Sequence, residues 1–243
     1  GNSTFDRINV IKPDLIKIDK SLFVDTKNNH INREIIKSIA RMGHNLGIRV
    51  LAEGVEDEDA ICLALKSNVN LFQGYYFSRP VFELDTFLMD KIIVKMNDIG
   101  TIFRRLTLDS INKKRDLVNN YNLLSNKIIE QIVDISDSEI ILKKVFKKHN
   151  DLEAFYLIDV DSSKQIHDTV IDNKNERFIP SKNGDEHYLK EYFYITLESK
   201  QGIFLSPNYV SYATGNICKT FAKRFELKNK SYIICIDIVM KEN

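Results

Sequence analysis

Three short apolar segments, separated by single amphipathic stretches, limit what the first eighty residues can form. Residues 15–19, 48–52 and 71–77 have the length and composition of strands. Between the first two, apolar residues recur at helical spacing and stop at Gly47, a C-cap residue. Between the second and third, Asp57 is placed to cap another helix. Strands joined by single helices form right-handed βαβ units, so the pattern predicts an α/β region with parallel strands.

From residue 86 the spacing changes to that of a long helix. Apolar residues recur every three or four positions over 89–106 and again over 118–132. The spacing predicts a long helix or a helical hairpin that connects two domains. Its apolar stripe either forms a seam with a second copy or packs on a neighbouring domain, and both alternatives remain open from the pattern alone.

The pattern of residues 136–243 predicts an α+β domain. Ser136 and Glu139 have the spacing of a capping box, which predicts a short helix starting there. Short strands follow. Residues 231–238 are predicted to form a central strand, which a turn at 228–230 joins to the preceding strand. The predicted fold class is therefore α/β plus α+β, with domains at 1–85, 86–135 and 136–243.

Composition excludes several classes of protein. The chain has 35 basic and 34 acidic residues, so a generally basic, polymer-binding surface for nucleic acid is not expected. No uncharged apolar run approaches the roughly 20 residues that span a bilayer. The three cysteines are odd in number and far apart, which argues against a disulfide framework and predicts a cytoplasmic location.

Polar residues interrupt the front strands near their C-terminal ends. Lys17 lies within the first strand, Glu53 follows the second and Gln73 interrupts the third. Parallel α/β enzymes place catalytic groups at these strand ends. The structural alternative is a Lys17–Glu53 salt bridge that only closes a buried core, since a lysine in a buried strand requires a partner.

The residues around these positions resemble a known family. Asp14-Leu-Ile-Lys-Ile-Asp19, Leu51-Ala-Glu-Gly-Val-Glu56 and Gln73-Gly-Tyr-Tyr-Phe-Ser-Arg-Pro80 are similar, in order and separation, to three successive motifs of EAL domains. EAL domains are bacterial cyclic di-GMP phosphodiesterases with a TIM-like barrel. The resemblance implies that residues 1–85 are the C-terminal half of a TIM-like (βα) barrel.

The resemblance also implies a chemistry. A complete EAL domain uses divalent cations, Mg²⁺ or Mn²⁺, to activate the water that opens cyclic di-GMP to linear pGpG. Lys17 would position that water or stabilise negative charge, Glu53 would act as general base or metal-site carboxylate, and Gln73 would orient water or a metal ligand. The implied substrate-binding residues are Phe77, Arg79 and Pro80, with supporting roles for Asp19 and Glu56.

The chain also departs from the family. The chain lacks the Glu-Ala-Leu motif, the upstream asparagine and glutamate ligands and the double aspartate. Most of the family's metal ligands are therefore missing, and the metal-binding residues of this chain are unknown. We therefore expect this chain alone to be inactive. It would be a proteolytic or engineered piece, a gene fragment, or a domain that another chain completes.

The C-terminal part resembles a second kind of domain. Ser206-Pro-Asn-Tyr-Val-Ser-Tyr-Ala-Thr-Gly215 and Cys235-Ile-Asp-Ile238 are similar to the PAS/Cache-like domain that follows some EAL domains. Such a domain is a regulatory sensor or dimerisation module. Alternatively, its tyrosines pack in the core and its hydroxyls satisfy turns. The polar and aromatic candidates for a small-ligand pocket are Tyr188, Lys190, Tyr192, Tyr209, Ser211, Thr214 and Asp237.

The resulting hypothesis is a homodimeric cyclic di-GMP signalling protein whose complete parent hydrolyses the nucleotide under control of the sensor. A non-catalytic cyclic di-GMP receptor, or a sensor and dimerisation protein, is the first alternative. A structural role is the second, in which the edge strand around Leu15–Ile18 pairs with a partner chain. An intact Glu-Ala-Leu motif upstream of Gly1 would favour catalysis.

Overall fold

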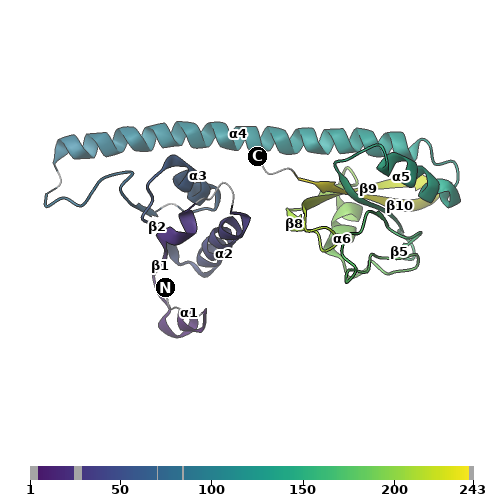
Figure 1. The fold of residues 1–243 in the computed structure, drawn as a ribbon, viewed down its shortest axis with the longest axis horizontal. Coiled ribbons are helices and arrows are strands. Elements are labelled where there is room, and N and C mark those ends of the chain that lie inside the picture. Colours follow the sequence, from purple (N-terminus) through teal and green to yellow (C-terminus); the bar gives the residue numbers. More distant parts are fainter. Residues whose placement is uncertain (1–4, 25–28, 70, 84, 241–243) are drawn as a thin grey trace. The chain divides into compact units, whose positions relative to one another are not determined.

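The chain forms two units, Gly1–Asn112 and Lys113–Asn243, each with its own core. The computed structural model describes residues 5–24, 29–69, 71–83 and 85–240, and Figure 1 shows their fold as a ribbon. The expected division at residues 85 and 135 stays a prediction, since the helix that crosses the boundary contributes residues to both units.

The front unit contains the parallel sheet that the strand–helix alternation predicts. Its strands lie in the order β1-β2-β3, and both neighbouring pairs are parallel. The elements before the connecting helix are α1 (Phe5–Ile11), β1 (Leu15–Ile18), a 3₁₀ turn (Lys20–Phe23), α2 (His30–Leu46), β2 (Arg49–Glu53), α3 (Glu58–Lys66) and β3 (Leu71–Gln73).

The ends of the two front helices follow the local chemistry of the sequence. Gly47 ends α2 in the left-handed conformation, with φ of 69°, and its N–H donates to carbonyls of the last turn. The Asp57 carboxylate accepts a hydrogen bond from Ala60 N at 2.8 Å and caps α3. Both predicted caps are confirmed.

The front core occupies one face of the sheet. Ile18, Val50 and Ala52 are buried against Ile36 of α2 and Ile61 of α3. Successive side chains of a strand point to opposite faces. The strand residues between these buried positions therefore point away from the helices. This explains why polar residues of the sheet are exposed.

One continuous helix, α4 (Thr86–Ile129), follows the front sheet, so the hairpin alternative is wrong. Ile99 is buried in the front core, whereas Tyr121 and Ile128 are buried in the rear core. Packing on the two domains thus accounts for part of the apolar stripe. Several other apolar side chains of α4 are exposed, namely Ile93, Val94, Met96, Leu108 and Ile111.

The rear unit is built on an antiparallel sheet, with strands in the order β5-β4-β10-β9-β7, β6 beside β4 and β8 beside β9. The predicted central strand is confirmed as β10, and its turn from β9 places Lys228 and Asn229 at φ of 49° and 62°, a type I′ pattern. The elements are a 3₁₀ turn (Ile135–Asp137), α5 (Ser138–Phe146), β4 (Leu152–Asp159), β5 (Lys164–Gln165), β6 (Val170–Ile171), α6 (Glu191–Glu198), β7 (Ile203–Leu205), β8 (Tyr209–Val210), β9 (Ile217–Leu227) and β10 (Lys230–Val239).

The two faces of this sheet are covered differently. On one face, Phe155, Phe221 and Ile234 pack with residues of α4 and α5. On the other face, Phe193 of α6 packs with Cys235 and other strand residues. This second face also carries Asp237, two residues beyond Cys235, and it is the face that carries the polar cavity described below.

The predicted capping box at Ser136 is wrong. The Asp134 carboxylate accepts hydrogen bonds from both the backbone N–H and the hydroxyl of Ser136, at 3.1 and 2.9 Å. A carboxylate is the stronger acceptor, and Lys228 holds it in place at 2.6 Å. The helix therefore starts at Ser138, and Glu139 pairs with Lys143 instead of reaching back to the cap.

Within the part of the chain that the structure describes, no helix combines the length and apolar character that crossing a membrane requires.

Candidate functional site

The structure brings Lys17, Glu53 and Gln73 to one face of the front sheet. Lys17 pairs with Leu51 across β1 and β2, and Glu53 pairs with Gln73 across β2 and β3. Residues paired in a parallel ladder share a face, and so do residues two apart in a strand. All three polar side chains therefore project from the face opposite the helices, toward the C-terminal ends of the strands.

Lys17 and Glu53 form an accessible ion pair. The Lys17 ammonium donates to Glu53 Oε1 at 3.4 Å, and the two side chains are 51% and 38% exposed. The prediction that Lys17 sits in a buried strand is wrong, because only the alternate positions of β1 point to the core. The salt bridge of the structural alternative forms, but it does not close a core.

Two glycines hold the strand ends close together. Gly54 has φ of 66°, a left-handed conformation that favours glycine, directly after Glu53. A Cβ on Gly74 would lie 2.0 Å from Val55 O, so only glycine permits this approach of the two loops. Val55 N in turn donates to Gln73 O at 3.0 Å. These contacts fix Glu53 and Gln73 as neighbours.

The supporting candidates have different positions. Asp19 accepts a hydrogen bond from Ser21 N at 2.9 Å and caps the 3₁₀ turn after β1. That backbone hydrogen bond, with a second from the Ser21 side chain, lowers the pKa of Asp19. Glu56 is exposed in the loop before α3.

The three expected substrate-binding residues differ in their burial. Phe77 is partly buried, with its ring 5.3 Å from Tyr76, and it lines an apolar cavity of about 630 Å³ beside α4. Arg79 is exposed, with its guanidinium 5.4 Å from the centre of the Tyr75 ring. Pro80 is exposed next to it. The structure thus places Phe77 against the core and leaves Arg79 and Pro80 accessible.

The metal expected for a complete EAL domain does not fit the residues described. Among them, no group of three or more His, Cys, Asp and Glu side chains is close enough to hold an ion. Mg²⁺ requires near-octahedral oxygen coordination. Beside Lys17 and Gln73, Glu53 supplies a single carboxylate, so the described residues do not by themselves build a metal centre.

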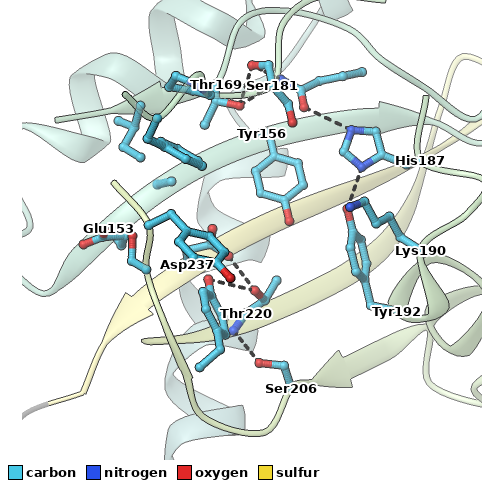
Figure 2. A pocket seen from close by; sticks show the side chains of 18 of the residues that line it. Glu153, Tyr156, Thr169, Ser181, His187, Lys190, Tyr192, Ser206, Thr220 and Asp237 are labelled. Atoms are coloured by element: carbon cyan, nitrogen blue, oxygen red, sulfur yellow. Dashed lines mark hydrogen bonds between the residues drawn. The ribbon is translucent and has the colours of Figure 1, made fainter. Parts of the chain in front are cut away.

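The rear unit contains a second candidate site, a cavity of about 790 Å³ on the α6 face of the sheet (Figure 2). Five of the seven expected pocket residues line it, whereas Tyr188 is 45% exposed outside it and the Thr214 hydroxyl donates to Glu153 at 2.5 Å. The five lining residues are Lys190, Tyr192, Tyr209, Ser211 and Asp237.

Asp237 is the acidic centre of this cavity. The Thr220 hydroxyl donates to Asp237 Oδ1 at 2.6 Å and lies 3.2 Å from the Tyr209 hydroxyl. Burial raises the pKa of Asp237 to about 6, although hydrogen bonds from Thr220 and Tyr209 oppose the shift. Burial also raises the pKa of Tyr209. The carboxyl group therefore titrates near neutral pH.

A second polar group in the cavity centres on His187, which the sequence did not single out. Its Nε2 lies 3.1 Å from Gln165 Oε1, and its Nδ1 lies 2.6 Å from the Tyr192 hydroxyl. An amide oxygen only accepts, so Nε2 carries the proton and Nδ1 accepts from Tyr192. Burial lowers the pKa of His187, which favours this neutral form, and its ring stacks on Tyr156 at 5.7 Å.

Glu153 is another lining residue that sequence reasoning missed. It is only 5% exposed and accepts hydrogen bonds from Thr214 and from Asn216 Nδ2 at 3.2 Å. Glu153, Gln165 and His187 come from separate segments, so no local motif connects them. The signal that was available is the alternation of β10, which places a charged Asp237 on the face of buried Cys235.

Comparison with known proteins identifies the front segment. Residues 1–80 match the EAL domain. Within this match lie the three strands of the front sheet and Lys17, Glu53 and Gln73. The expected resemblance of this segment to the EAL family is therefore confirmed.

Curated relatives extend the comparison. The probable cyclic di-GMP phosphodiesterase PdeD of Escherichia coli K12 is 32% identical over 81 residues, which cover 33% of this chain and 15% of PdeD. The uncharacterized EAL-domain containing protein YkuI of Bacillus subtilis is 23% identical over 232 residues, which cover 91% of this chain and 55% of YkuI. The chain thus spans less than two thirds of either relative.

A solved structure shares the fold over nearly the whole chain. The crystal structure of Bacillus subtilis YkuI, with an EAL domain, in complex with substrate c-di-GMP and calcium, superposes with a TM-score of 0.72. The match covers 98% of this chain and 60% of the YkuI chain at 18% identity. The mixed fold, an EAL-type segment followed by an antiparallel-sheet domain, is thus confirmed.

Proposed function

We propose that the front unit is the C-terminal half of a TIM-like EAL barrel whose complete form hydrolyses cyclic di-GMP to linear pGpG. The observation that carries this proposal is the position of Lys17, Glu53 and Gln73 on one face of adjacent parallel strands. They lie near the strand ends, where barrel enzymes assemble their sites, and within the segment that matches the EAL domain. Curated relatives described as cyclic di-GMP phosphodiesterases support the substrate.

In this proposal each residue has a distinct role. Lys17 positions the attacking water or stabilises the negative charge that develops on the phosphate. Glu53 acts as general base or as a metal-site carboxylate, and Gln73 orients the water or a metal ligand. Arg79 is accessible to a phosphate group, while Phe77 and Pro80 shape the nucleotide pocket and Asp19 and Glu56 anchor the loops.

We expect the 243-residue chain to be inactive by itself. Its described carboxylates form no three-ligand cluster, so the Mg²⁺ or Mn²⁺ that complete EAL domains use requires further ligands. Among the described strands, β1 pairs only with β2, and Leu15 remains 36% exposed at this edge. An open parallel edge favours pairing with further barrel strands, or with another chain.

We further propose that the rear unit is a PAS/Cache-like sensor that controls the front unit from a cytoplasmic homodimer. Its cavity, which combines polar and aromatic side chains, supports a small-ligand site. Exposed apolar side chains on α4, such as Met96 and Ile111, support self-association. Three free, buried cysteines are compatible with a reducing compartment.

The test compares two preparations, the 243-residue chain and the protein as its host cell makes it. Cyclic di-GMP is supplied with excess Mg²⁺ or Mn²⁺, and linear pGpG is followed by chromatography. We expect turnover only by the host-made protein, with a loss of at least about 100-fold in Glu53→Gln. Glu34→Gln is the matched control, because Glu34 is an exposed carboxylate on α2 that pairs with Lys37.

Turnover by the short chain would overturn the expectation of inactivity. Full activity of Glu53→Gln in the host-made protein would overturn the assigned site.

A non-catalytic receptor for cyclic di-GMP is the second candidate function. The observation that favours it is the lack of a three-ligand metal cluster among the described residues. A receptor would bind cyclic di-GMP in equilibrium dialysis and return it unchanged after prolonged incubation with metal. Recovery of linear pGpG instead would exclude this candidate.

A further inference from the structure

We propose that the cavity of the rear unit binds a small organic cation, an ammonium group on an apolar body, through the carboxylate of Asp237. This inference rests on the proposed sensor role and names the chemical class of its ligand. It follows from the charges that face the cavity, from the position of Asp237 on the sheet and from the aromatic rings that line the cavity.

Negative charge predominates among the groups that line the cavity. Asp237, Glu153 and Glu191 line it, and Lys190 is the one lysine or arginine among its lining residues. Burial lowers the pKa of His187, which favours its neutral form beside Gln165 and Tyr192. In Figure 2, Lys190 and Asp237 lie on opposite sides of Tyr156. An anionic ligand would therefore meet net repulsion, whereas a cation would be attracted.

Asp237 has no cationic partner among the described residues. None of the ion pairs in the described part of the chain involves Asp237 or Glu153. A buried carboxylate without a counter-charge is costly, and a bound cation would lower that cost. Among the described residues, the fold thus leaves an ionisable group without a counter-charge, which a cationic ligand would supply.

The cavity reaches Asp237 because its neighbours in the sheet are short. Ala154 of β4 and Thr220 of β9 pair directly with Asp237 across the sheet. Neither side chain is long enough to cover Asp237, which is half-buried as a whole residue and lines the cavity. Asp237 Oδ1 accepts a hydrogen bond from Thr220, which fixes the orientation of the carboxylate.

Aromatic rings form much of the remaining lining and suit the same ligand. The electron-rich face of an aromatic ring attracts a cation and is indifferent to a neutral group of the same size. The Phe178 and Tyr212 rings stack at 6.5 Å. The aromatic residues of the lining are Tyr156, Phe178, Tyr192, Phe204, Tyr209 and Tyr212.

The test titrates the 243-residue chain by calorimetry with probes that differ only in charge. The aromatic series is tyramine, its neutral analogue tyrosol and the anion para-hydroxyphenylacetate. The aliphatic pair is choline and its uncharged carbon isostere, dimethylbutanol. We expect at least one cation to bind at least about tenfold more tightly than its neutral analogue, and the anion to bind more weakly than both.

Variants connect the charge preference to Asp237. Asp237→Asn should weaken cation binding by at least about tenfold and leave tyrosol binding unchanged. Thr220→Val removes the donor to Asp237 and should weaken cation binding less. Glu226→Gln is the matched control, because Glu226 is an exposed carboxylate on β9 that does not line the cavity. Circular dichroism checks the fold of each variant.

Three results would overturn the inference: neutral or anionic probes that bind as tightly as the cations, no cation binding below about 1 mM, or an Asp237→Asn affinity equal to that of Glu226→Gln. The titration contains no cyclic di-GMP. If the chain binds cations but the host-made protein does not hydrolyse cyclic di-GMP, the proposed enzymatic function is wrong and this inference stands. If the host-made protein hydrolyses cyclic di-GMP but the chain binds no cation, this inference is wrong and the enzymatic function stands.

Discussion

The front and rear units both carry a carboxylate on a sheet face, yet the two carboxylates have different surroundings. Glu53 lies on an open face beside Lys17, with 38% of its side chain exposed. Asp237 lies in a cavity without a cationic partner among the described residues, and burial raises its pKa to about 6. Solvent and a neighbouring ammonium stabilise a charged carboxylate, whereas burial destabilises it. The ionisation of Asp237 should therefore affect the stability of the rear unit more than the ionisation of Glu53 affects that of the front unit.

This contrast has a structural origin in how each sheet is covered. The helices α2 and α3 pack on the front sheet through the face of Ile18, Val50 and Ala52. The rear sheet has residues packed on both faces, so a polar group on its second face is enclosed. The comparison predicts large effects of substitutions in the rear unit and small ones at the front ion pair.

The largest effect is expected in the rear core. Phe155→Ala removes a fully buried ring and should lower the free energy of unfolding of the rear unit by about 3–5 kcal/mol. Phe72→Ala, at a partly buried position of the front unit, should cost about half as much in its own unit. Urea titrations with hydrogen exchange read by mass spectrometry assign each loss to a unit. Equal losses from the two variants would contradict the contrast in core packing.

The next effect is a pH-dependent stabilisation by Asp237→Asn. The folded pKa of about 6 exceeds the usual value of 3.8, so ionisation opposes folding as pH rises through this range. The cost is about 3 kcal/mol at about pH 8 and about half of that at about pH 5. Asp237→Asn should recover much of this cost at the higher pH and less at the lower one.

Urea unfolding at the two pH values measures this difference, with Glu226→Gln as the exposed control. A variant that is destabilised equally at both pH values would show that the Asp237 hydrogen bonds outweigh its burial.

A smaller effect is expected at the loop that joins the front strand ends. Gly74→Ala places a Cβ 2.0 Å from Val55 O and should cost about 2–3 kcal/mol in the front unit. Gly100→Ala is the control, because Gly100 lies within α4 with no atom within 4 Å of the added Cβ. That control should stabilise the helix by about 0.5–1 kcal/mol. Similar effects of the two variants, measured by thermal unfolding, would exclude the close backbone approach.

The smallest effect concerns the front ion pair. A double-mutant cycle on Lys17 and Glu53 should give a coupling energy of under about 1 kcal/mol, since both side chains are well exposed. The Glu139–Lys143 pair of α5, at 2.6 Å and similarly exposed, provides a reference of the same order. A Lys17–Glu53 coupling energy above about 2 kcal/mol is typical of a buried ion pair. It would contradict the contrast between an exposed carboxylate in the front unit and a buried one in the rear unit.

Local sequence signals predicted much of the framework. The caps at Gly47 and Asp57 depend on the conformation and hydrogen bonding of single residues, and both are confirmed. The same kind of reasoning was wrong at Ser136, where the neighbouring Asp134 and Lys228, which is distant in sequence, take part. Local rules hold where no distant residue competes for the same group.

The strand-end site could also be foreseen, because its parts have fixed positions in their strands. Lys17, Glu53 and Gln73 each lie near the end of a parallel strand, and register brings them together. Their exposure could not be foreseen, since it depends on which face the helices cover. The rear cavity was predicted only in part, because Glu153 and His187 join Asp237 from segments far apart in the chain.

The periodicities of this protein follow from its amino-acid sequence alone. They are three strands with helices between them, a long helix, a central strand with an acidic residue, and the motifs of an EAL segment. Which polar residues are solvated and which are buried depends on how the elements pack. Periodicity depends on near neighbours in the chain, whereas the environment of a carboxylate depends on every element that packs around it.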